Sequence, residues 1–152
     1  MKAVVILDTE LSSLHPMEEV MERRNYIVYR CATLPEAIAA CQSKAAPVDL
    51  AILDVPLKGS ESQMDAAVQL QRACPEMPLL LVSDQPLERW PEADFRLFGK
   101  LLSGRIDLLR KPLTERSFLA KANSLLYTVT YRESRALFDA AVASRAVAAN
   151  AS

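Results

Sequence analysis

Apolar residues form short unbroken runs that recur along the chain, separated by longer segments in which they recur every three or four positions. Unbroken runs that contain β-branched residues are typical of strands buried on both faces of a parallel sheet. The pattern predicts five such strands, at residues 3–7, 26–30, 50–53, 79–82 and 106–109. The second and fifth runs also contain polar residues, which favours the two edges of the sheet for these strands.

The segments between the predicted strands have the periodicity of helices with one apolar face. Ser12 or Ser13 is the expected N-terminal cap of the first helix, because a serine hydroxyl accepts a hydrogen bond from a backbone N–H of the first turn. Thr33 and Glu36 have the spacing of a capping box at the start of the second helix. Strands that alternate with helices predict an α/β fold with right-handed crossovers. The helices are expected around residues 14–21 and over residues 33–43, 63–73 and 92–102.

The C-terminal segment is free of helix-breaking residues, since neither glycine nor proline follows Pro112. An apolar stripe over residues 118–129 predicts a further helix capped by Thr114, and residues 127–131 interrupt it. Residues 136–152 then contain eight alanines in 17 positions. One interpretation, which we favour, is a frayed or solvent-exposed helical tail. The other is a dimerisation or signalling helix that uses Leu137, Phe138, Ala141 and Val142.

The composition is that of one globular domain. The chain has 152 residues, of which 51% are hydrophobic and 24% charged, and its formal net charge is -1. This balance excludes a disordered or collagen-like chain. The near-zero charge gives no reason to expect a nucleic-acid or membrane-surface partner. No apolar run approaches the roughly 18 residues of a membrane span.

Cysteine and histidine are too few for a disulfide framework or a zinc site. The three cysteines, Cys31, Cys41 and Cys74, are widely spaced and form no CxxC motif, and the chain has one histidine. The N-terminus has one basic residue followed by two acids, unlike a secretory signal. We therefore expect a reduced, cytoplasmic protein.

Four polar side chains stand at or just past the C-terminal ends of predicted strands: Asp8, Asp54, Ser83 and Lys111. In a parallel sheet these ends share one edge, where open α/β sheets form their ligand crevices. Two carboxylates at one edge repel each other and attract a divalent cation such as Mg²⁺, which prefers oxygen ligands. A lysine and a hydroxyl beside such a cation suit phosphoryl oxygens. This set indicates phosphoryl transfer, with a carboxylate as metal ligand or as nucleophile.

Segments of the chain resemble, in order, the four motifs of the receiver domain of bacterial response regulators, which have the CheY-like fold. They are VILDTE at residues 5–10, DLAILDV at 49–55, PLLLVS at 78–83 and RKP at 110–112. LDVPLKG at residues 53–59 is also similar to a subgroup with LDVxLxG. The resemblance covers about residues 1–126 and implies a doubly wound, five-stranded parallel sheet of order 2-1-3-4-5. Residues 127–152 would form a helical C-terminal extension.

The resemblance implies a role for each matching position. Asp54 would be the phosphoacceptor, which takes a phosphoryl group from a phosphohistidine of a sensor histidine kinase or phosphotransfer protein. Asp8, Asp54 and the backbone carbonyl of Pro56 would hold Mg²⁺, with Glu10 as a further candidate ligand. Lys111 would pair with the phosphoryl group.

The resemblance also implies how the signal leaves the site. Ser83 would reach a phosphoryl oxygen and pass the change to the last helices and strand, and the Lys111–Pro112 bond is expected to be cis. The implied protein acts by contact with an unidentified downstream protein, or as a homodimer through its last helix. Its only catalysis would be to assist its own phosphorylation. The chain is either a single-domain regulator or the N-terminal piece of a longer protein.

Three positions depart from the family pattern. Thr9 stands where the family has a second acid, Asp84 where it prefers a very small residue, and Leu108 where it has an aromatic. These departures leave a second class open: a pseudo-receiver that serves as a protein-interaction or dimerisation module without phosphorylation. A third class, a flavodoxin-like FMN protein, needs a Ser/Thr/Gly phosphate loop after the first strand, where this chain has an acidic turn.

Overall fold

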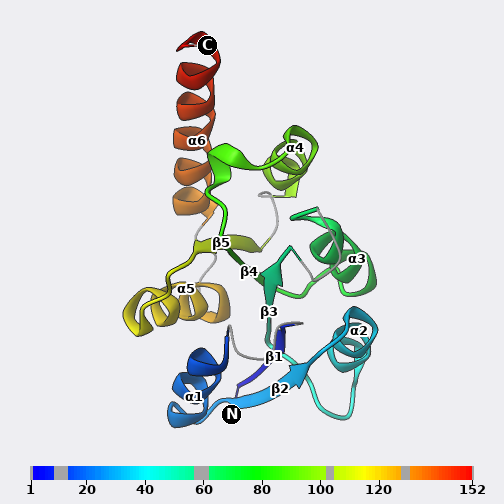
Figure 1. The fold of residues 1–152 in the computed structure, drawn as a ribbon. Helices are drawn as coiled ribbons and strands as arrows, with labels where there is room; N and C mark the ends of the chain where they lie inside the picture. Colours follow the sequence, from blue (N-terminus) through cyan, green and yellow to red (C-terminus); the bar gives the residue numbers. More distant parts are fainter. Residues whose placement is uncertain (1, 9–13, 57–61, 102–104, 128–130, 152) are drawn as a thin grey trace.

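The computed structural model describes residues 2–8, 14–56, 62–101, 105–127 and 131–151. Five parallel strands form one sheet in the order β2-β1-β3-β4-β5, which confirms the predicted fold and places β2 and β5 at its edges (Figure 1). The strands are β1 (Ala3–Leu7), β2 (Ile27–Cys31), β3 (Leu50–Val55), β4 (Leu79–Ser83) and β5 (Ile106–Arg110).

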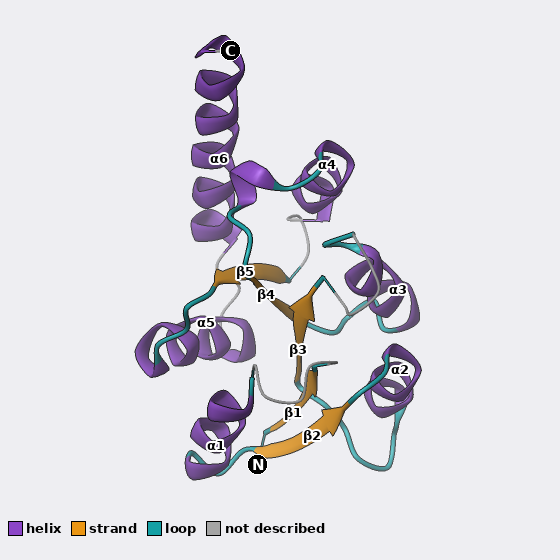
Figure 2. Ribbon diagram, viewed as in Figure 1, coloured by secondary structure: helices purple, strands orange, loops and turns teal. Residues whose placement is uncertain are grey.

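Helices cover both faces of the sheet (Figure 2). α1 (His15–Arg23) and α5 (Glu115–Tyr127) lie on one face. The other face carries α2 (Leu34–Gln42), α3 (Asp65–Ala73) and α4 (Glu92–Leu101). A short 3₁₀ helix that the pattern does not predict, η1 (Leu87–Arg89), precedes α4, and α6 (Tyr131–Ala151) follows α5. In the part of the chain that the structure describes, no helix is long and apolar enough to cross a membrane.

The alternation of side chains along each strand divides the core in two. Val4 and Ile6 of β1 belong to the cluster beneath α1 and α5, where Phe118 is fully buried. Val5 and Leu7 belong to the cluster beneath α2, α3 and α4. Every residue of β1 and of β4 is buried, as expected for strands in the interior of a parallel sheet.

Three strands are longer than their predicted runs, because pairing continues through polar residues. In β5 the pairing includes Arg110, which is in register with Ser83. Asp54 and Val55 are in register with Val82 and Ser83. β3 therefore ends at Val55 and β4 at Ser83. As a result, Asp54 and Ser83 lie within strands, whereas Asp8 and Lys111 directly follow theirs.

Two of the three predicted helix caps are present. At the start of α5 the Thr114 hydroxyl accepts a hydrogen bond from the Ser117 N–H at 3.1 Å, as predicted. The Thr33 hydroxyl accepts a hydrogen bond from the Glu36 N–H at 3.3 Å and caps α2 as expected. In α1 the cap position falls on Leu14, without a side-chain cap, so the expectation of a serine cap is wrong. Ser12 and Ser13 themselves lie outside the described residues.

The C-terminal helix is docked on the body of the protein, and the expectation of an exposed tail is wrong for one of its faces. Ala141 is only 1% exposed, and the Phe138 ring stacks on Phe95 of α4 with 4.9 Å between centroids. In an alanine-rich helix the hydrophobic pattern does not mark one face clearly as apolar. The sequence therefore does not predict this contact. Leu137 and Val142 stay 41% and 43% exposed.

Candidate functional site

Strand register brings the four predicted site residues to one edge of the sheet. Leu7 pairs with Leu53, so Asp8 and Asp54 follow at equivalent positions of neighbouring strands. On the other side of β3, Val55 pairs with Ser83, and Ser83 pairs with Arg110. Lys111 comes next, and its N–H donates to the Ser83 carbonyl at 2.9 Å.

The centre of the site is an ion pair between Asp54 and Lys111. The Lys111 Nζ lies 2.8 Å from the Asp54 Oδ1, and the two side chains are 18% and 13% exposed. Partial burial reduces solvent screening, so this pair is stronger than one on an open surface. The Lys111–Pro112 peptide bond is cis, as predicted. Asp84 also approaches Lys111, with 3.8 Å between its Oδ1 and Nζ, but its side chain is 70% exposed.

Asp8 links the site to the start of α1. Its side chain is 3% exposed, and its Oδ2 accepts a hydrogen bond from the Leu14 N–H at 2.9 Å. Its own N–H donates to the Cys31 carbonyl at the end of β2 at 3.2 Å. This backbone bond and the Leu14 contact hold Asp8 in place at the end of β1.

Ser83 is the site residue whose environment differs from the expectation. Its side chain is fully buried, and its hydroxyl lies 3.0 Å from the Gln63 Oε1 and 3.2 Å from the Gln85 carbonyl, to either of which it can donate. The hydroxyl oxygen also accepts from the Gln85 N–H at 3.1 Å. A hydroxyl has one proton, so any new acceptor at the site competes with Gln63 and Gln85 for it.

Two of the residues around Ser83 are functional candidates that sequence reasoning missed. The Asp94 carboxylate of α4 accepts from the Gln63 N–H at 3.0 Å and from the Ser62 hydroxyl at 2.8 Å. Asp94 thus holds the segment whose Gln63 side chain contacts Ser83. Both residues fall in predicted helices, where a polar side chain is expected to face solvent, and both are buried.

The resemblance implies Asp8, Asp54 and the Pro56 carbonyl as metal ligands, with Glu10 as a further candidate. Glu10 and Thr9 lie outside the described residues. Pro56 is described, exposed and preceded by a cis bond, and the role of its carbonyl stays a prediction. Among the described residues, no group of three or more His, Cys, Asp and Glu side chains is arranged to hold a metal ion.

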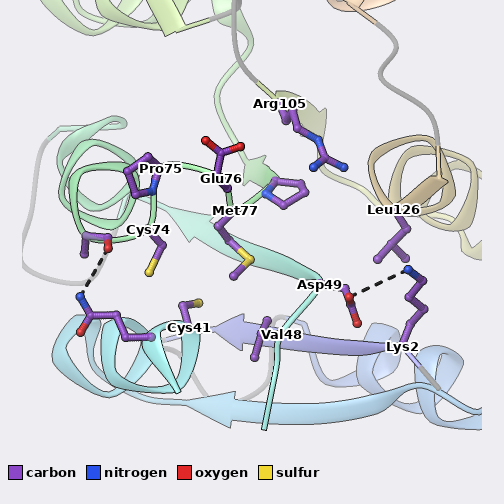
Figure 3. Close-up of a pocket in the computed structure, with 13 residues that line it drawn as sticks. Lys2, Cys41, Val48, Asp49, Cys74, Pro75, Glu76, Met77, Arg105 and Leu126 are labelled. Atoms are coloured by element: carbon purple, nitrogen blue, oxygen red, sulfur yellow. Dashed lines mark hydrogen bonds and ion pairs between the residues drawn. The ribbon is translucent and has the colours of Figure 1, made fainter. Parts of the chain in front are cut away.

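A pocket of about 540 Å³ lies at the opposite, amino-terminal edge of the sheet (Figure 3). Lys2, Asp49 and Arg105, which directly precede strands, line it together with Cys41 and Cys74. Lys2 Nζ is 3.9 Å from the Asp49 Oδ1. None of the predicted site residues lines this pocket.

The environment of Cys41 predicts an unreactive thiol. Burial, with smaller effects of Cys74 and Cys31, raises the pKa of Cys41 from 9.0 to about 12. A raised pKa lowers the thiolate fraction at any pH below it, and only the thiolate is nucleophilic. We expect alkylation of Cys41 by iodoacetamide at pH ~8 to be at least about 100-fold slower in the folded protein than in denaturant. Peptide mass spectrometry gives both rates, and equal rates would contradict the raised pKa of this partly buried thiol.

The fold agrees with that of solved receiver domains. A CheY-like response regulator receiver domain from Methanospirillum hungatei JF-1 has a TM-score of 0.67 and 20% identity, covering 83% of this chain and 94% of that chain. The receiver domain from Clostridium thermocellum has a TM-score of 0.66 and 17% identity, and the alignment covers 83% of this chain and 94% of that chain. The Vibrio cholerae chemotaxis protein CheY4 has a TM-score of 0.63 and 22% identity, and the alignment covers 83% of this chain and 99% of that chain. No family model and no curated protein matches the sequence.

These identities are low, so the likeness concerns the fold. The chain has the CheY-like receiver fold over most of its length, which confirms at that level the resemblance drawn from the four sequence motifs. The alignments cover 94% to 99% of these three neighbours, so this chain contains their complete fold.

Proposed function

We propose that this chain is a receiver module of two-component signalling that accepts a phosphoryl group on Asp54. The observation that carries the proposal is the 2.8 Å ion pair between Lys111 and Asp54 at the carboxyl edge of a receiver-type sheet. Asp8 stands at the equivalent position of the neighbouring strand. An acidic pair beside a lysine suits a reaction in which a carboxylate attacks a phosphoryl group.

The proposed chemistry uses three side chains in distinct roles. An oxygen of the Asp54 carboxylate attacks the phosphorus of a phosphohistidine on a partner kinase or phosphotransfer protein. The new P–O bond forms as the P–N bond breaks, and the imidazole, which is protonated on its other ring nitrogen, leaves as the neutral ring with the electron pair of that bond. Lys111, already within contact distance of Asp54, stabilises the negative charge on the phosphoryl oxygens. Ser83 would then donate to a phosphoryl oxygen, which requires its hydroxyl to leave Gln63 or Gln85.

The carboxylates of Asp8 and Asp54 are ligands of the type that magnesium prefers, which supports the expected Mg²⁺ site. Asp8 and Asp54 supply carboxylate oxygens from neighbouring strands, and the Pro56 carbonyl is a third candidate of the same hard-ligand type. Mg²⁺ commonly keeps several waters, so two carboxylates suffice for the protein's share. When bound, Mg²⁺ would neutralise charge on the carboxylates and on the phosphoryl oxygens.

Intact mass after incubation with Mg²⁺ and phosphoramidate, a donor with a P–N bond, tests the proposal. We expect a single phosphoryl increment in the wild type and none in Asp54→Asn, which removes the attacking carboxylate and keeps the size of the side chain. An increment in both proteins would place the modification elsewhere. No increment in either would exclude Asp54 as an acceptor from this donor.

A second function, that of a pseudo-receiver, is favoured by the burial of Ser83. Its hydroxyl is fully buried and bonded within the fold, and the exposed Asp84 carboxylate adds negative charge beside Lys111. In this role the protein would serve as an interaction or dimerisation module. Absence of phosphorylation together with failure to bind beryllofluoride, a phosphoryl mimic, would favour it.

A further inference from the structure

Arg145 ties α6 to the segment that follows β4. Its Nη1 donates to the carbonyls of Glu88 and Trp90 at 3.0 Å each, and its Nη2 forms an ion pair with the Glu92 carboxylate. The hydrogen bond from Arg145 lowers the pKa of Glu92, with a smaller effect of Arg96. The guanidinium carbon also lies 4.2 Å from the centre of the Phe95 ring, within cation–π range. One arginine thus contacts both η1 and the first turn of α4.

Phe138 and Ala141 form the apolar part of the same contact. The Phe138 ring stacks on Phe95 and lies 6.3 Å from the Phe98 ring. Gly99 of α4 makes room for it, because a Cβ at this position would come within 2.8 Å of the Phe138 Cε2. The face of α6 that docks therefore carries an aromatic residue, a small residue three positions later and an arginine four positions after that.

The segment that receives α6 is hydrogen-bonded to Ser83. Gln85 contacts the Ser83 hydroxyl through its N–H and its carbonyl. The same carbonyl accepts from the Trp90 indole Nε1 at 3.2 Å, and the Trp90 carbonyl accepts from Arg145. A continuous path of hydrogen bonds thus runs from Ser83 through Gln85 and Trp90 to α6.

The α6 contact has the features of a reversible one. A groove of about 430 Å³ runs beside it, lined by Phe95, Val142 and Arg145 among others, so solvent reaches this edge of the contact. The ion pair at its centre involves Glu92, whose side chain is 56% exposed. The distal part of α6 lies far from the sheet (Figure 1). Its alanines keep helical propensity high when the helix is undocked.

We propose that η1 and α4 form a docking surface for an amphipathic helix with the Phe138–Ala141–Arg145 pattern, that α6 occupies it within the chain, and that movement of Ser83 releases α6. The proposal of a docking surface is supported by the contacts of α6 and does not depend on phosphorylation. The signal that moves Ser83 rests on the proposed phosphorylation of Asp54.

Hydrogen–deuterium exchange of peptides from α6 tests the docking without phosphorylation. We expect exchange at least about tenfold faster in Arg145→Ala, which removes the polar anchor, and in Gly99→Ala, which displaces Phe138 while raising the helix propensity of α4. Arg116→Ala, which removes an exposed arginine from α5, is the charge-matched control and should leave α6 exchange unchanged. Wild-type exchange in both α6 variants would overturn the docking surface.

Two further proteins test the link to Ser83. In Ser83→Ala the contact with Gln85 is lost, and we expect faster exchange in α6 but not in α1, which packs on the other face of the sheet. With beryllofluoride, whose binding is followed separately by fluorine NMR, the wild type should show the same change and Asp54→Asn should not. Unchanged α6 exchange in Ser83→Ala, or in wild type that has bound the mimic, would overturn the link. Failure of the mimic to bind counts against Asp54 as acceptor, and the link is then decided by Ser83→Ala.

Discussion

Replacing Lys121 by methionine is expected to destabilise the protein by about 3 kcal/mol. Asp107 of β5 is fully buried, and the Lys121 Nζ, on α5, lies 3.0 Å from its Oδ2. The other oxygen of Asp107, Oδ1, accepts a hydrogen bond from the Leu108 N–H at 2.7 Å. Without the ammonium group, the Asp107 carboxylate keeps its desolvation penalty and loses the opposite charge. The Lys121 side chain is 26% exposed, so water reaches its end and the effect belongs at the lower end of the range for buried pairs.

Urea denaturation followed by far-ultraviolet circular dichroism measures this difference. Lys44→Met removes an exposed lysine and serves as the charge-matched control, with a change within about 0.5 kcal/mol. The double variant Asp107→Leu/Lys121→Met removes both charges, and it should recover most of the lost stability because no buried charge is left. If the single and the double variant were equally destabilised, the loss would come from packing rather than from the unpaired carboxylate.

Replacing Lys111 by methionine is expected to slow phosphorylation by about 100-fold, the size of effect found when one donor to a developing negative charge is removed. The ammonium group is within 2.8 Å of the Asp54 carboxylate and is mostly buried, so water replaces it poorly. The rate is measured as the appearance of phosphorylated protein by intact mass over time. Circular dichroism establishes that the variant is folded.

Arg110→Met is the matched control for this prediction. Arg110 directly precedes Lys111, and its side chain is exposed, so its loss changes net charge by the same amount without removing a contact to Asp54. We expect a decrease of no more than about threefold for this variant, because charges on an open surface are screened. Equal effects of both substitutions would mean that Lys111 acts only through the general field of the site.

The fold follows from the sequence because its signals are local. The run at residues 3–7 is β1, and the capping hydroxyl of Thr33 starts α2 as predicted. Asp54 and Lys111 were found because the carboxyl ends of parallel strands must share one edge. The contacts of Ser83 were not predicted, since Gln63 is 20 positions away and reaches it through a side chain whose direction no periodicity reveals.

The C-terminal helix shows the same limit at longer range. Arg145 contacts the Trp90 carbonyl across 55 positions, and nothing local distinguishes it from an arginine that faces solvent. In an alanine-rich helix the faces differ little in hydrophobicity, so the sequence pattern does not predict which side of α6 is buried. Trp90 is 2% exposed and its indole N–H donates to the Gln85 carbonyl, so its side chain packs within the fold.

Because Gly99 is required where α6 docks, the residue at this position in related sequences indicates whether their terminal helix docks in the same way. Glycine in the interior of a helix costs about 1 kcal/mol relative to alanine, so this position of α4 drifts to larger residues unless something requires the space. Here the Phe138 ring requires it. Homologues that have lost the terminal helix are therefore free to fill position 99, and those that keep the helix on this surface should retain glycine there. Covariation between this position and an aromatic residue early in the terminal helix would trace when, in the history of the lineage, the helix became part of the domain.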